Sequence, residues 1–357
     1  MFANKSKFLT GILTGVLALS LVGCGASSGG DKAKPVNLTG AGSTFAYPLL
    51  NKQIEEYRKN NSTTMINYQG VGSGAGIKQV TEQTIDFGAT DGPMTDDQLK
   101  AAKGGKILQV PLTLGAVAVT YNIPNAPKDL KLAPAVLADI FLGKITNWND
   151  QKIAADNPGV TLPDLKIAVV RRSDGSGTTY IFSDYLSSIS PDWLSKVGKG
   201  TSVNWPIGIG GKGNAGVAGA ITQTPGAIGY VELAYAVQNS LSFATLQNKE
   251  AKWVAPSLKG ASAAAAASKI PDDMRVSLVN APGAETYPIA GFTWGLIYQD
   301  QKDKDKGTAL VNFLNWSIHD GQALSEELLY AKLPAELVTR EETMLKTITS
   351  GGQPLLK

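Results

Sequence analysis

The stretch "VVRRSDGSGTTYIF" (residues 169–182) joins three kinds of local structure in a short span. Its two valines end an apolar, β-branched run that is typical of a buried strand. The Ser-Asp-Gly-Ser-Gly sequence that follows favours a turn, and the spacing of apolar residues after Thr178 favours a helix. A strand that passes through a short turn into a helix is the repeating unit of α/β proteins. This stretch therefore predicts an α/β fold.

Three more segments repeat this order of strand, glycine-rich turn and helix: "LTGAGSTFAYP" (38–48), "YQGVGSGAGIKQV" (68–80) and "GIGGKGNAGVAGAI" (208–221). A helix N-terminus presents unpaired N–H groups and partial positive charge, so with glycine and hydroxyl residues beside it, it suits a small anion. Serine and threonine also cap many helices without binding anything. Each turn alone is therefore a weak signal, and the prediction of an anion site rests on all four.

Apolar runs alternate with amphipathic stretches along the rest of the chain, and no internal repeat is present. The strand-like runs are "MINYQGVG" (65–72), "TIDFGAT" (84–90), "ILQVPLTLGAVAVTYNI" (107–123), "GAIGYVEL" (226–233) and "FTWGLIYQ" (292–299). The helix-like stretches are "AYPLLNKQIEEYRKN" (46–60), "GAGIKQVTEQT" (74–84), "APAVLADIFLG" (133–143), "GTALVNFLNWSIHD" (307–320) and "EELLYAKLP" (326–334). This alternation extends the α/β prediction to most of the chain.

The N-terminus has the pattern of a secretory signal peptide. Two lysines precede an apolar run from Phe8 to Val22, which is shorter than the roughly 20 residues that a membrane-spanning helix needs. The ending Leu-Val-Gly-Cys resembles a bacterial lipobox, which implies cleavage of residues 1–23 and attachment of a lipid to Cys24. The alternative is an ordinary signal peptide with a cysteine there by chance. Cys24 is the only cysteine, so it cannot form an internal disulfide.

Residues 24–35 are rich in glycine, serine, lysine and alanine, so we expect a flexible tether between the membrane and the folded body. More than 300 residues remain after residues 1–23 are removed, and a chain of that length usually divides into lobes. The same removal leaves 31 basic residues against 30 acidic ones. This near-even balance provides no overall field that would attract nucleic acid, so we expect no nucleic-acid partner.

The residue inventory argues against an enzyme. His319 is the only histidine, and it fits a surface or half-buried packing role better than that of a catalytic base. The chain's one G-x-S-x-G sequence, Gly25–Gly29, lies in the expected tether and not at a turn between a strand and a helix, and the chain has no metal-binding cluster. The "GGKGNAG" sequence is not a Walker loop, because Gly213 follows Lys212 where serine or threonine is required. We expect no catalytic residue, no metal and no cofactor.

Several long blocks resemble one family of proteins. They are "GAGSTFAYP", "NYQGVGSGAGIKQV", "DFGATDGPMT", "IAVVRRSDGSGT", "WPIGIGGKGNAGVAGAI" and "GAIGYVELAYA". In this order they resemble the bacterial phosphate-binding proteins of phosphate-specific ABC transporters, which are periplasmic substrate-binding lipoproteins. The resemblance covers about residues 38–340. It implies a type II periplasmic-binding-protein fold, in which crossing strands join two α/β lobes with the ligand in the cleft between them.

The resemblance also implies lobe boundaries that the sequence by itself does not reveal. Lobe one would hold residues 36–118 together with 290–357, and lobe two residues 119–289. The strands that cross between the lobes would lie near "AVAVTYNIP" and "YPIAGFTWG".

Carried over by position, the family's contacts with phosphate fall on residues whose identities are all present. The implied phosphate-binding residues are Thr44, Phe45 through its backbone N–H, Ser73, Asp91, Arg172, Ser176, Gly177 and Thr178. Asp174 would lie behind these contacts and hold Arg172 in place. Ser43 and Ala75, where the sequence departs from the family pattern, lie beside the contacts.

The two charged contacts have different physical roles. Arg172 offers a planar fork of donors to two oxygens of the anion. Asp91, when ionised, can only accept hydrogen bonds, so it would select an anion that still carries a proton; phosphate does, and sulfate does not. Without the resemblance, the sequence favours a different role for Asp91, a cap of the turn in "TDGPM", because Asp-Gly pairs often act in this way.

The resemblance implies a high-affinity receptor that delivers inorganic phosphate to the permease subunits of an ABC importer. It would act as a monomer, anchored by lipid to the bacterial membrane and facing the periplasm or the cell exterior. The alternatives are a binding protein for another tetrahedral oxyanion, such as sulfate or molybdate, a phosphatase, and a surface phosphate sensor or adhesin.

Overall fold

The computed structural model of this chain describes residues 34–125 and 129–356. The predicted signal peptide (1–23), Cys24 and the tether up to residue 33 lie outside the described residues. Residues 35–357 form one compact unit.

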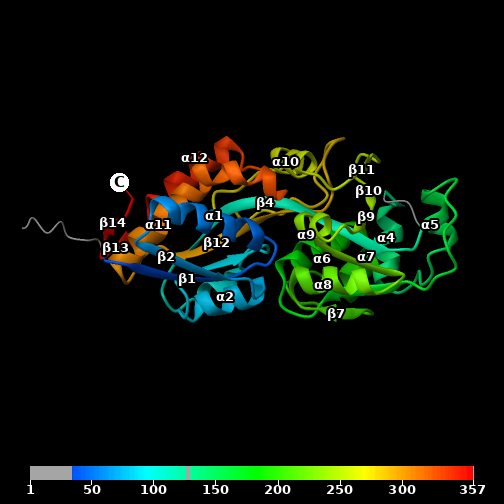
Figure 1. Ribbon diagram of the computed structural model, residues 1–357, viewed down its shortest axis with the longest axis horizontal. Coiled ribbons are helices and arrows are strands. Elements are labelled where there is room, and N and C mark those ends of the chain that lie inside the picture. The colour runs from blue at the N-terminus through cyan, green and yellow to red at the C-terminus, as the bar shows by residue number, and fades with distance from the viewer. Residues whose placement is uncertain (1–33, 126–128, 357) are drawn as a thin grey trace, which may run out of the picture. The chain divides into compact units, whose positions relative to one another are not determined.

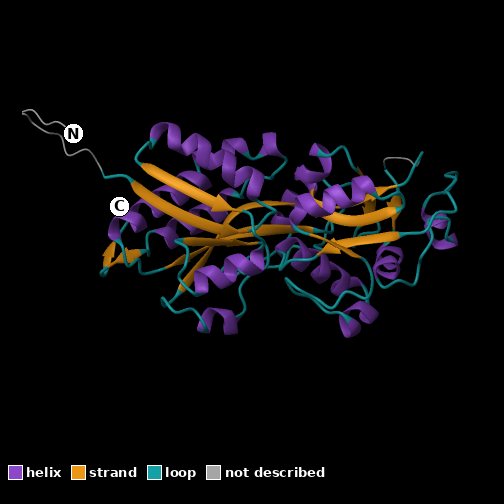
Figure 2. Ribbon diagram, turned by 60° about the horizontal axis from the view of Figure 1, so that its bottom comes forward, coloured by secondary structure: helices purple, strands orange, loops and turns teal. Residues whose placement is uncertain are grey.

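Strands and helices alternate along the unit, which confirms the predicted α/β class (Figure 2). The helices are α1 (Tyr47–Asn60), α2 (Ser73–Thr81), α3 (Asp96–Lys100), α4 (Pro134–Phe141), α5 (Gln151–Asp156), α6 (Gly177–Ile189), α7 (Pro191–Lys196), α8 (Gly213–Gln223), α9 (Leu233–Gln238), α10 (Leu258–Ala266), α11 (Lys304–Ile318) and α12 (Ala335–Leu345). Two 3₁₀ turns, Asp320–Leu324 and Glu326–Leu328, lie between α11 and α12.

The strands are β1 (Val36–Gly42), β2 (Thr64–Gln69), β3 (Phe87–Thr90), β4 (Ile107–Asn122), β5 (Lys131–Leu132), β6 (Ala168–Arg172), β7 (Ile209–Gly211), β8 (Ala227–Glu232), β9 (Ser242–Phe243), β10 (Thr245–Gln247), β11 (Trp253–Val254), β12 (Ala290–Tyr298), β13 (Thr349–Ser350) and β14 (Gln353–Pro354). The largest sheet has the strand order β2-β1-β3-β12-β4-β8-β6-β7, and β9 pairs with β4.

Strand β4 connects the two halves of this sheet (Figure 1). Residues 107–116 pair with β12, and residues 117–122 pair with β8. The change of partner falls near the predicted crossing. Both β4 and β12 are buried almost throughout, which explains why each reads in the sequence as a nearly continuous apolar run.

Two large groups of buried residues fill the two halves. One surrounds the C-terminal part of β4 together with β6 and β8 and includes Trp148, Phe182 and Tyr230. The other surrounds the N-terminal part of β4 together with β1, β3 and β12 and includes Phe87 and Trp294. The buried residues of 261–281 belong to the second group, although the predicted lobe two runs to residue 289. The division into lobes itself stays a prediction.

One predicted helix is absent. Of the stretch 326–334, only the 3₁₀ turn at its start is helical. Leu329 then has a left-handed backbone (φ 65°), which ends the turn. Ala331 forms an isolated β-bridge with Leu114 on β4. Contact with a distant strand therefore overrides the helical spacing of the leucines.

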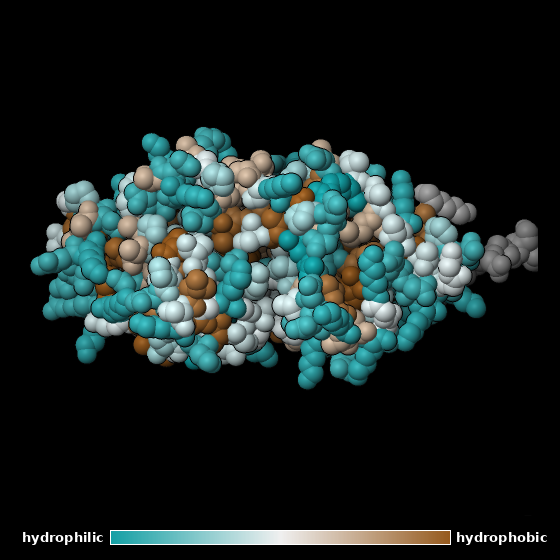
Figure 3. Space-filling view, turned by 180° about the vertical axis from the view of Figure 1, so that it is seen from behind, coloured by the Kyte–Doolittle hydropathy of each residue, from teal (hydrophilic) through white to brown (hydrophobic). Residues whose placement is uncertain are grey.

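The surface of the unit is mixed in polarity. On the face shown in Figure 3, hydrophilic residues predominate, and hydrophobic residues form smaller groups between them. Among residues 34–125 and 129–356, every helix is too short or too polar to cross a bilayer.

Candidate functional site

The four glycine-rich turns singled out in the sequence come together in the fold. Each lies where a strand leads into a helix: β1 into α1, β2 into α2, β6 into α6, and β7 into α8. The N–H of Gly74 on α2 donates to the carbonyl of Gly175, which precedes α6, at 2.9 Å. Thr44, which precedes α1, accepts hydrogen bonds from Asn214 on α8. The turns of one half of the sheet therefore meet those of the other half.

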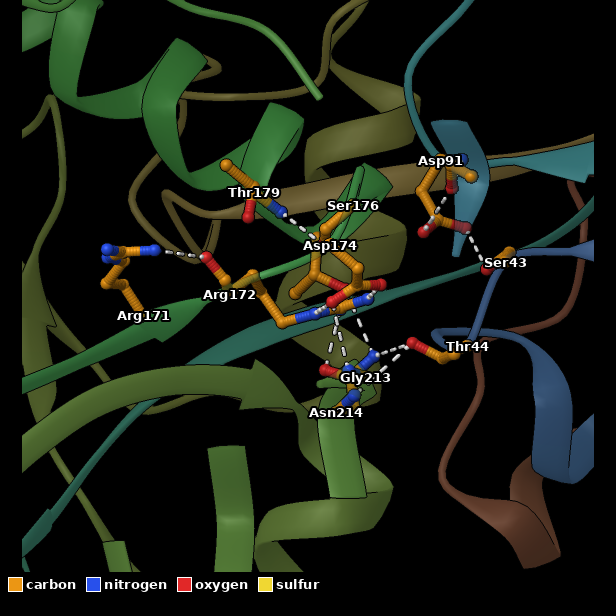
Figure 4. A network of polar contacts seen from close by, with 12 residues as sticks. Ser43, Thr44, Asp91, Arg171, Arg172, Asp174, Ser176, Thr179, Gly213 and Asn214 are labelled. Carbon is orange, nitrogen blue, oxygen red and sulfur yellow. Dashed lines mark hydrogen bonds and ion pairs between the residues drawn. The ribbon is translucent and has the colours of Figure 1, made fainter. Parts of the chain in front are cut away.

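Asp91 directly follows β3 and is almost completely buried, with 1% of its surface exposed. Its Oδ1 atom accepts a hydrogen bond from the hydroxyl of Ser43 (Figure 4). It accepts a second one, at 2.6 Å, from the hydroxyl of Thr293. Its Oδ2 atom lies 3.4 Å from the hydroxyl of Ser73, the first residue of α2. Burial raises the pKa of Asp91 from 3.8 to about 6, against the opposing effect of these hydrogen bonds and of the charge of Arg172. Asp91 is therefore ionised at neutral pH.

The N-terminus of α6 faces Asp91. Ser176 caps the helix, since its hydroxyl accepts a 3.0 Å hydrogen bond from the N–H of Thr179. A Cβ atom placed on Gly177 would lie 2.4 Å from Oδ2 of Asp91 and 2.5 Å from the hydroxyl of Ser73. Only glycine permits this close approach. The positive end of α6 therefore lies against the Oδ2 side of the carboxylate.

Arg172 ends β6 and is also buried, with 3% of its surface exposed. Its Nε and Nη2 atoms donate to the two carboxylate oxygens of Asp174 at 2.8 and 2.5 Å. Gly213 adds a backbone hydrogen bond to Asp174 at 3.0 Å. Burial acts to raise the pKa of Asp174, but the hydrogen bonds and charge of Arg172 outweigh it and lower that pKa. The pair is therefore ionised and neutral in sum, as expected for a positioning role of Asp174.

Asn214 links two of the predicted hydroxyl donors. Its side-chain amide donates to the hydroxyl oxygens of Thr44 at 2.9 Å and Thr178 at 3.1 Å. Its own carbonyl accepts the backbone N–H of Glu232 at 3.0 Å, which fixes the orientation of the amide. Because the amide occupies an acceptor position on each threonine, the hydroxyl proton of Thr44 can point elsewhere, whereas the hydroxyl of Thr178 also lies 3.5 Å from the carbonyl oxygen of Asn214, to which it can donate.

The ring of Phe45 is buried in the core, so only its backbone is placed to take the predicted role at the site. The hydroxyl of Tyr330 donates to the carbonyl of Phe45 at 2.6 Å, and the hydroxyl of Tyr235 donates to the carbonyl of Thr44 at 2.7 Å. These two tyrosines hold the turn before α1 in place. A pocket of about 570 Å³ borders this turn; Thr44, Tyr47, Asp174, Asn214 and Tyr235 are among its lining residues.

All of the predicted contact residues thus lie in or beside the same group of turns. Sequence reasoning missed Thr293 and Asn214, and it treated Ser43 only as a neighbour of the contacts. Asn214 lies in a turn that the sequence singled out, so the signal for it existed. Thr293 lies in an otherwise apolar strand, where nothing local distinguishes a functional hydroxyl from ordinary β-propensity.

His319 lies at the C-terminal end of α11, and its hydrogen-bond partners are not residues of these turns. Its ring nitrogens lie 2.7 Å from the carbonyl of Asn315 and 2.6 Å from a carboxylate oxygen of Glu342. This arrangement matches the packing role expected for it. Within the described ranges, no three or more His, Cys, Asp or Glu side chains are grouped so that they could hold a metal ion.

Comparison with known proteins identifies the family. Residues 26–320 match the PBP superfamily domain. The chain is 45% identical over 315 residues to the phosphate-binding protein PstS of Xylella fastidiosa (strain 9a5c), covering 87% of this chain and 85% of that one. It is 42% identical over 313 residues to the PstS of Pasteurella multocida (strain Pm70), covering 87% and 90%.

A crystal structure of a phosphate-binding protein from Stenotrophomonas maltophilia shares the fold, with a TM-score of 0.68 at 17% identity, covering 89% of this chain and 99% of that one. The likeness confirms the predicted periplasmic-binding-protein fold. From the sequence matches, the chain belongs to the PstS family of phosphate-binding proteins within the PBP superfamily.

Proposed function

We propose that this protein binds inorganic phosphate and delivers it to the permease subunits of an ABC importer. Its membership of the PstS family supports the proposal. The observation that carries it is the buried approach of the α6 N-terminus to Asp91, with Arg172 close enough to act on the charge of that carboxylate. Donors that surround a single acceptor suit a small anion that still carries a proton.

The donors replace the water that phosphate loses on entering the site. They are the side chains or backbone N–H groups of Thr44, Phe45, Ser73, Arg172, Ser176, Gly177 and Thr178. Stripping an anion of water costs many kcal/mol, and each hydrogen bond to a charged partner contributes roughly 1.5–3 kcal/mol. Several such bonds together can offset the desolvation. Since Asp174 already balances Arg172, binding relies on directed hydrogen bonds more than on net charge.

Asp91 supplies the selectivity. An ionised carboxylate accepts a hydrogen bond from the proton of phosphate, whereas sulfate would bring a bare oxygen against it. A site built around such a proton rejects an analogue that lacks it by about 10⁴–10⁵ in favourable cases. Replacing Asp91 with asparagine would introduce a hydrogen-bond donor at this position and so reduce the difference between the affinities for phosphate and sulfate.

The predicted contacts come from both halves of the sheet, so a bound ligand would influence how the two halves are positioned relative to each other. Thr44, Ser73 and Asp91 come from one half, and Arg172 and the start of α6 from the other. A ligand that touches both halves favours the closed arrangement by its difference in affinity for the two states. The closed, loaded form is then what the permease recognises.

The predicted lipid on Cys24 and the tether to residue 35 would hold this body at the outer side of the cell membrane, as a monomer. We propose no catalytic step. Another tetrahedral oxyanion as ligand, or a phosphate sensor that does not hand on its ligand, are the alternatives. Loss of phosphate uptake after deletion of the gene supports the transport role; unchanged uptake would favour the sensor.

Isothermal titration calorimetry on the lipid-free protein tests the binding function. We expect tight binding of phosphate, weak or no binding of sulfate, and no turnover of a chromogenic phosphate ester. Arg172→Ala should weaken phosphate binding by roughly a hundredfold or more, because it leaves the half-buried Asp174 without its cationic partner as well as removing donors. Arg275→Ala is the control, since Arg275 pairs with Asp96 and Asp273 instead. Equal affinities in the two variants would remove Arg172 from the site.

A further inference from the structure

We propose that Thr293, together with Ser43, is a positioning residue that keeps Asp91 an acceptor and thereby sets the discrimination between phosphate and fully ionised oxyanions. The inference rests on the proposed function, because it concerns the selectivity of that same site. Neither residue is among the contacts implied for phosphate itself. Both act through Asp91.

The two carboxylate oxygens of Asp91 have different surroundings. Oδ1 accepts hydrogen bonds from two hydroxyls, those of Ser43 and Thr293, the second at 2.6 Å. Oδ2 has a longer contact of 3.4 Å with Ser73 and lies toward the start of α6. The short contacts to Oδ1 therefore fix the rotation of the carboxylate and leave Oδ2 as the oxygen directed toward the predicted anion position.

Strand pairing places Thr293 beside Asp91, with regular register on the β3 side of β12 and an irregularity on its β4 side. Thr293 pairs with Thr113 on β4, but Trp294 pairs with Pro111, so β4 carries an extra residue, Leu112, at this point. Pro111 has no N–H that could join the hydrogen bonds between the two strands, and proline within a sheet is typically found at such a bulge. On its other side, Trp294 pairs with Thr90, the residue before Asp91. The register thus sets Thr293 beside Asp91.

The hydroxyl of Thr293 is not needed for the strand. Strand β12 has the sequence "AGFTWGLIY" and is buried along its whole length, and valine would fit its shape and β-propensity equally well. A buried hydroxyl is unfavourable unless it has a hydrogen-bond partner, and the carboxylate of Asp91 is that partner. The geometry therefore points to a role in the chemistry of Asp91.

That role is to favour the ionised form of the carboxylate. Burial raises the pKa of Asp91 to about 6, and the hydrogen bonds from Ser43 and Thr293 hold it below the value that burial alone would give. Loss of one of them would raise the pKa of Asp91 further and so increase its protonated fraction at neutral pH. A protonated carboxyl donates a hydrogen bond, so it would accommodate an oxygen of sulfate instead of repelling it.

Other titratable groups also act on Asp91, and substitution of Thr293 leaves each of them in place. Those that interact with its charge lie on β6, β2, β8, α9 and the segment before α12: Arg172, Tyr68, Glu232, Tyr235 and Tyr330. Tyr180 and Asp184 on α6 share a small cavity with Asp91. Burial raises the pKa of each tyrosine above its usual 10, so the tyrosines stay neutral at neutral pH. Burial also raises the pKa of Glu232 well above its usual value.

The test compares the wild-type protein, Thr293→Val and Thr293→Ser by calorimetric titration with sulfate and with phosphate between pH 5 and 8. Sulfate keeps the same charge over this range, so any pH dependence of its binding comes from the protein. In the wild type, sulfate binding should strengthen only as the pH falls below about 6. In Thr293→Val that rise should move to neutral pH, and the ratio of phosphate to sulfate affinity at pH 7 should fall about ten- to hundredfold. Thr293→Ser, which keeps the hydroxyl, should restore the wild-type profile.

A purely structural role for Thr293 would lower both affinities equally without moving the pH profile, and that result would overturn the inference. If Thr293→Val does not fold, Ser43→Ala carries the same test, because it removes the other donor to Oδ1; an unmoved sulfate profile in that variant would overturn it equally. Failure of the wild type to bind phosphate at any pH would instead refute the proposed function, so the two failures are distinguishable.

Discussion

At the scale of single residues, Asn214 does more than its place in a glycine-rich turn suggests. From α8 its side chain contacts Thr44, before α1, in one half of the sheet. It also contacts Thr178, at the start of α6, in the half to which Asn214 itself belongs. Its amide donates to both hydroxyl oxygens, so each hydroxyl can turn its proton toward an anion, that of Thr178 by giving up its long 3.5 Å contact with the carbonyl of Asn214. Asn214 therefore orients two donors without being required to touch the ligand.

Replacing Asn214 with alanine should weaken phosphate binding. Two hydrogen bonds that orient donors are lost, each contributing about 1 kcal/mol, so we expect a loss of roughly tenfold to thirtyfold in affinity by calorimetry. Asn157→Ala is the matched control, because Asn157 bonds to the backbone of Lys131 and Ile153; it should lower the melting temperature and leave affinity unchanged. Equal affinity in Asn214→Ala and the wild type would contradict the orienting role.

The residues of the site differ in how far the sequence could reveal them. Thr44, Ser73 and Ser176 lie in glycine-rich turns before helices, and that local pattern marks them. Asp91 and Thr293 are brought together only by the pairing of β3 with β12, elements about 200 positions apart in sequence. Sequence spacing carries no information on such pairings, so the hydroxyl behind Asp91 could not be predicted.

At the scale of elements, the start of α6 can approach the opposite half of the sheet because its first residue, Gly177, has no side chain. Gly177 has no room for a Cβ beside Asp91 and Ser73. The atoms that a Cβ would meet belong to Asp91 and Ser73, outside α6. A side chain at position 177 would therefore keep α6 away from Asp91, but it would not prevent the helix from forming.

Gly177→Ala should therefore impair phosphate binding while preserving the fold. The added methyl group would separate α6 from Asp91, and we expect affinity to fall by at least tenfold in calorimetry, with the circular dichroism spectrum unchanged. Gly219→Ala in α8 is the control: nothing lies within 4 Å of its Cβ position, so it should keep its affinity and gain up to about 1 kcal/mol in stability. Full affinity in Gly177→Ala would show that the close approach is dispensable.

The spacing of apolar residues predicted most helices and strands correctly. It failed where contact with a residue distant in the sequence determines the local structure. The buried strands β4 and β12 and the amphipathic helices α1 and α11 match their sequence patterns. The stretch 326–334 has helical leucine spacing, yet it bridges to Leu114 and presents Tyr330 to Phe45 and Glu232. Tertiary contacts outweigh a propensity difference of less than about 1 kcal/mol per residue.

At the scale of the whole molecule, one buried acid makes stability depend on pH. Glu341 on α12 is fully buried, one turn from Leu337 and Leu345, which belong to the core. Within the described residues neither of its carboxylate oxygens has a hydrogen-bond partner. Burial raises the pKa of Glu341 well above its usual 4.5. The folded state therefore holds the proton more tightly than the unfolded state, so stability is complete below pH 4.5 and declines as the pH rises above it.

Glu341→Leu should remove this decline. At pH 8 we expect its free energy of unfolding to exceed that of the wild type by about 1–3 kcal/mol, the usual cost of a buried polar group without a partner. At pH 4 the gain should be smaller, because both states are then protonated. Denaturant titrations at the two pH values measure this, with Glu336→Leu, an exposed position on the same helix, as control. A gain that does not change with pH would show that ionisation of Glu341 plays no part.

The unbroken course of β4 has a mechanical consequence. A single strand of 16 residues is hydrogen-bonded to β12 along one part and to β8 along the next, with no flexible loop between the two. The proposed closure of one half against the other would therefore twist a paired strand, and the strand would resist that twist elastically. A phosphate ion that closes the two halves would have to supply the energy of this twist.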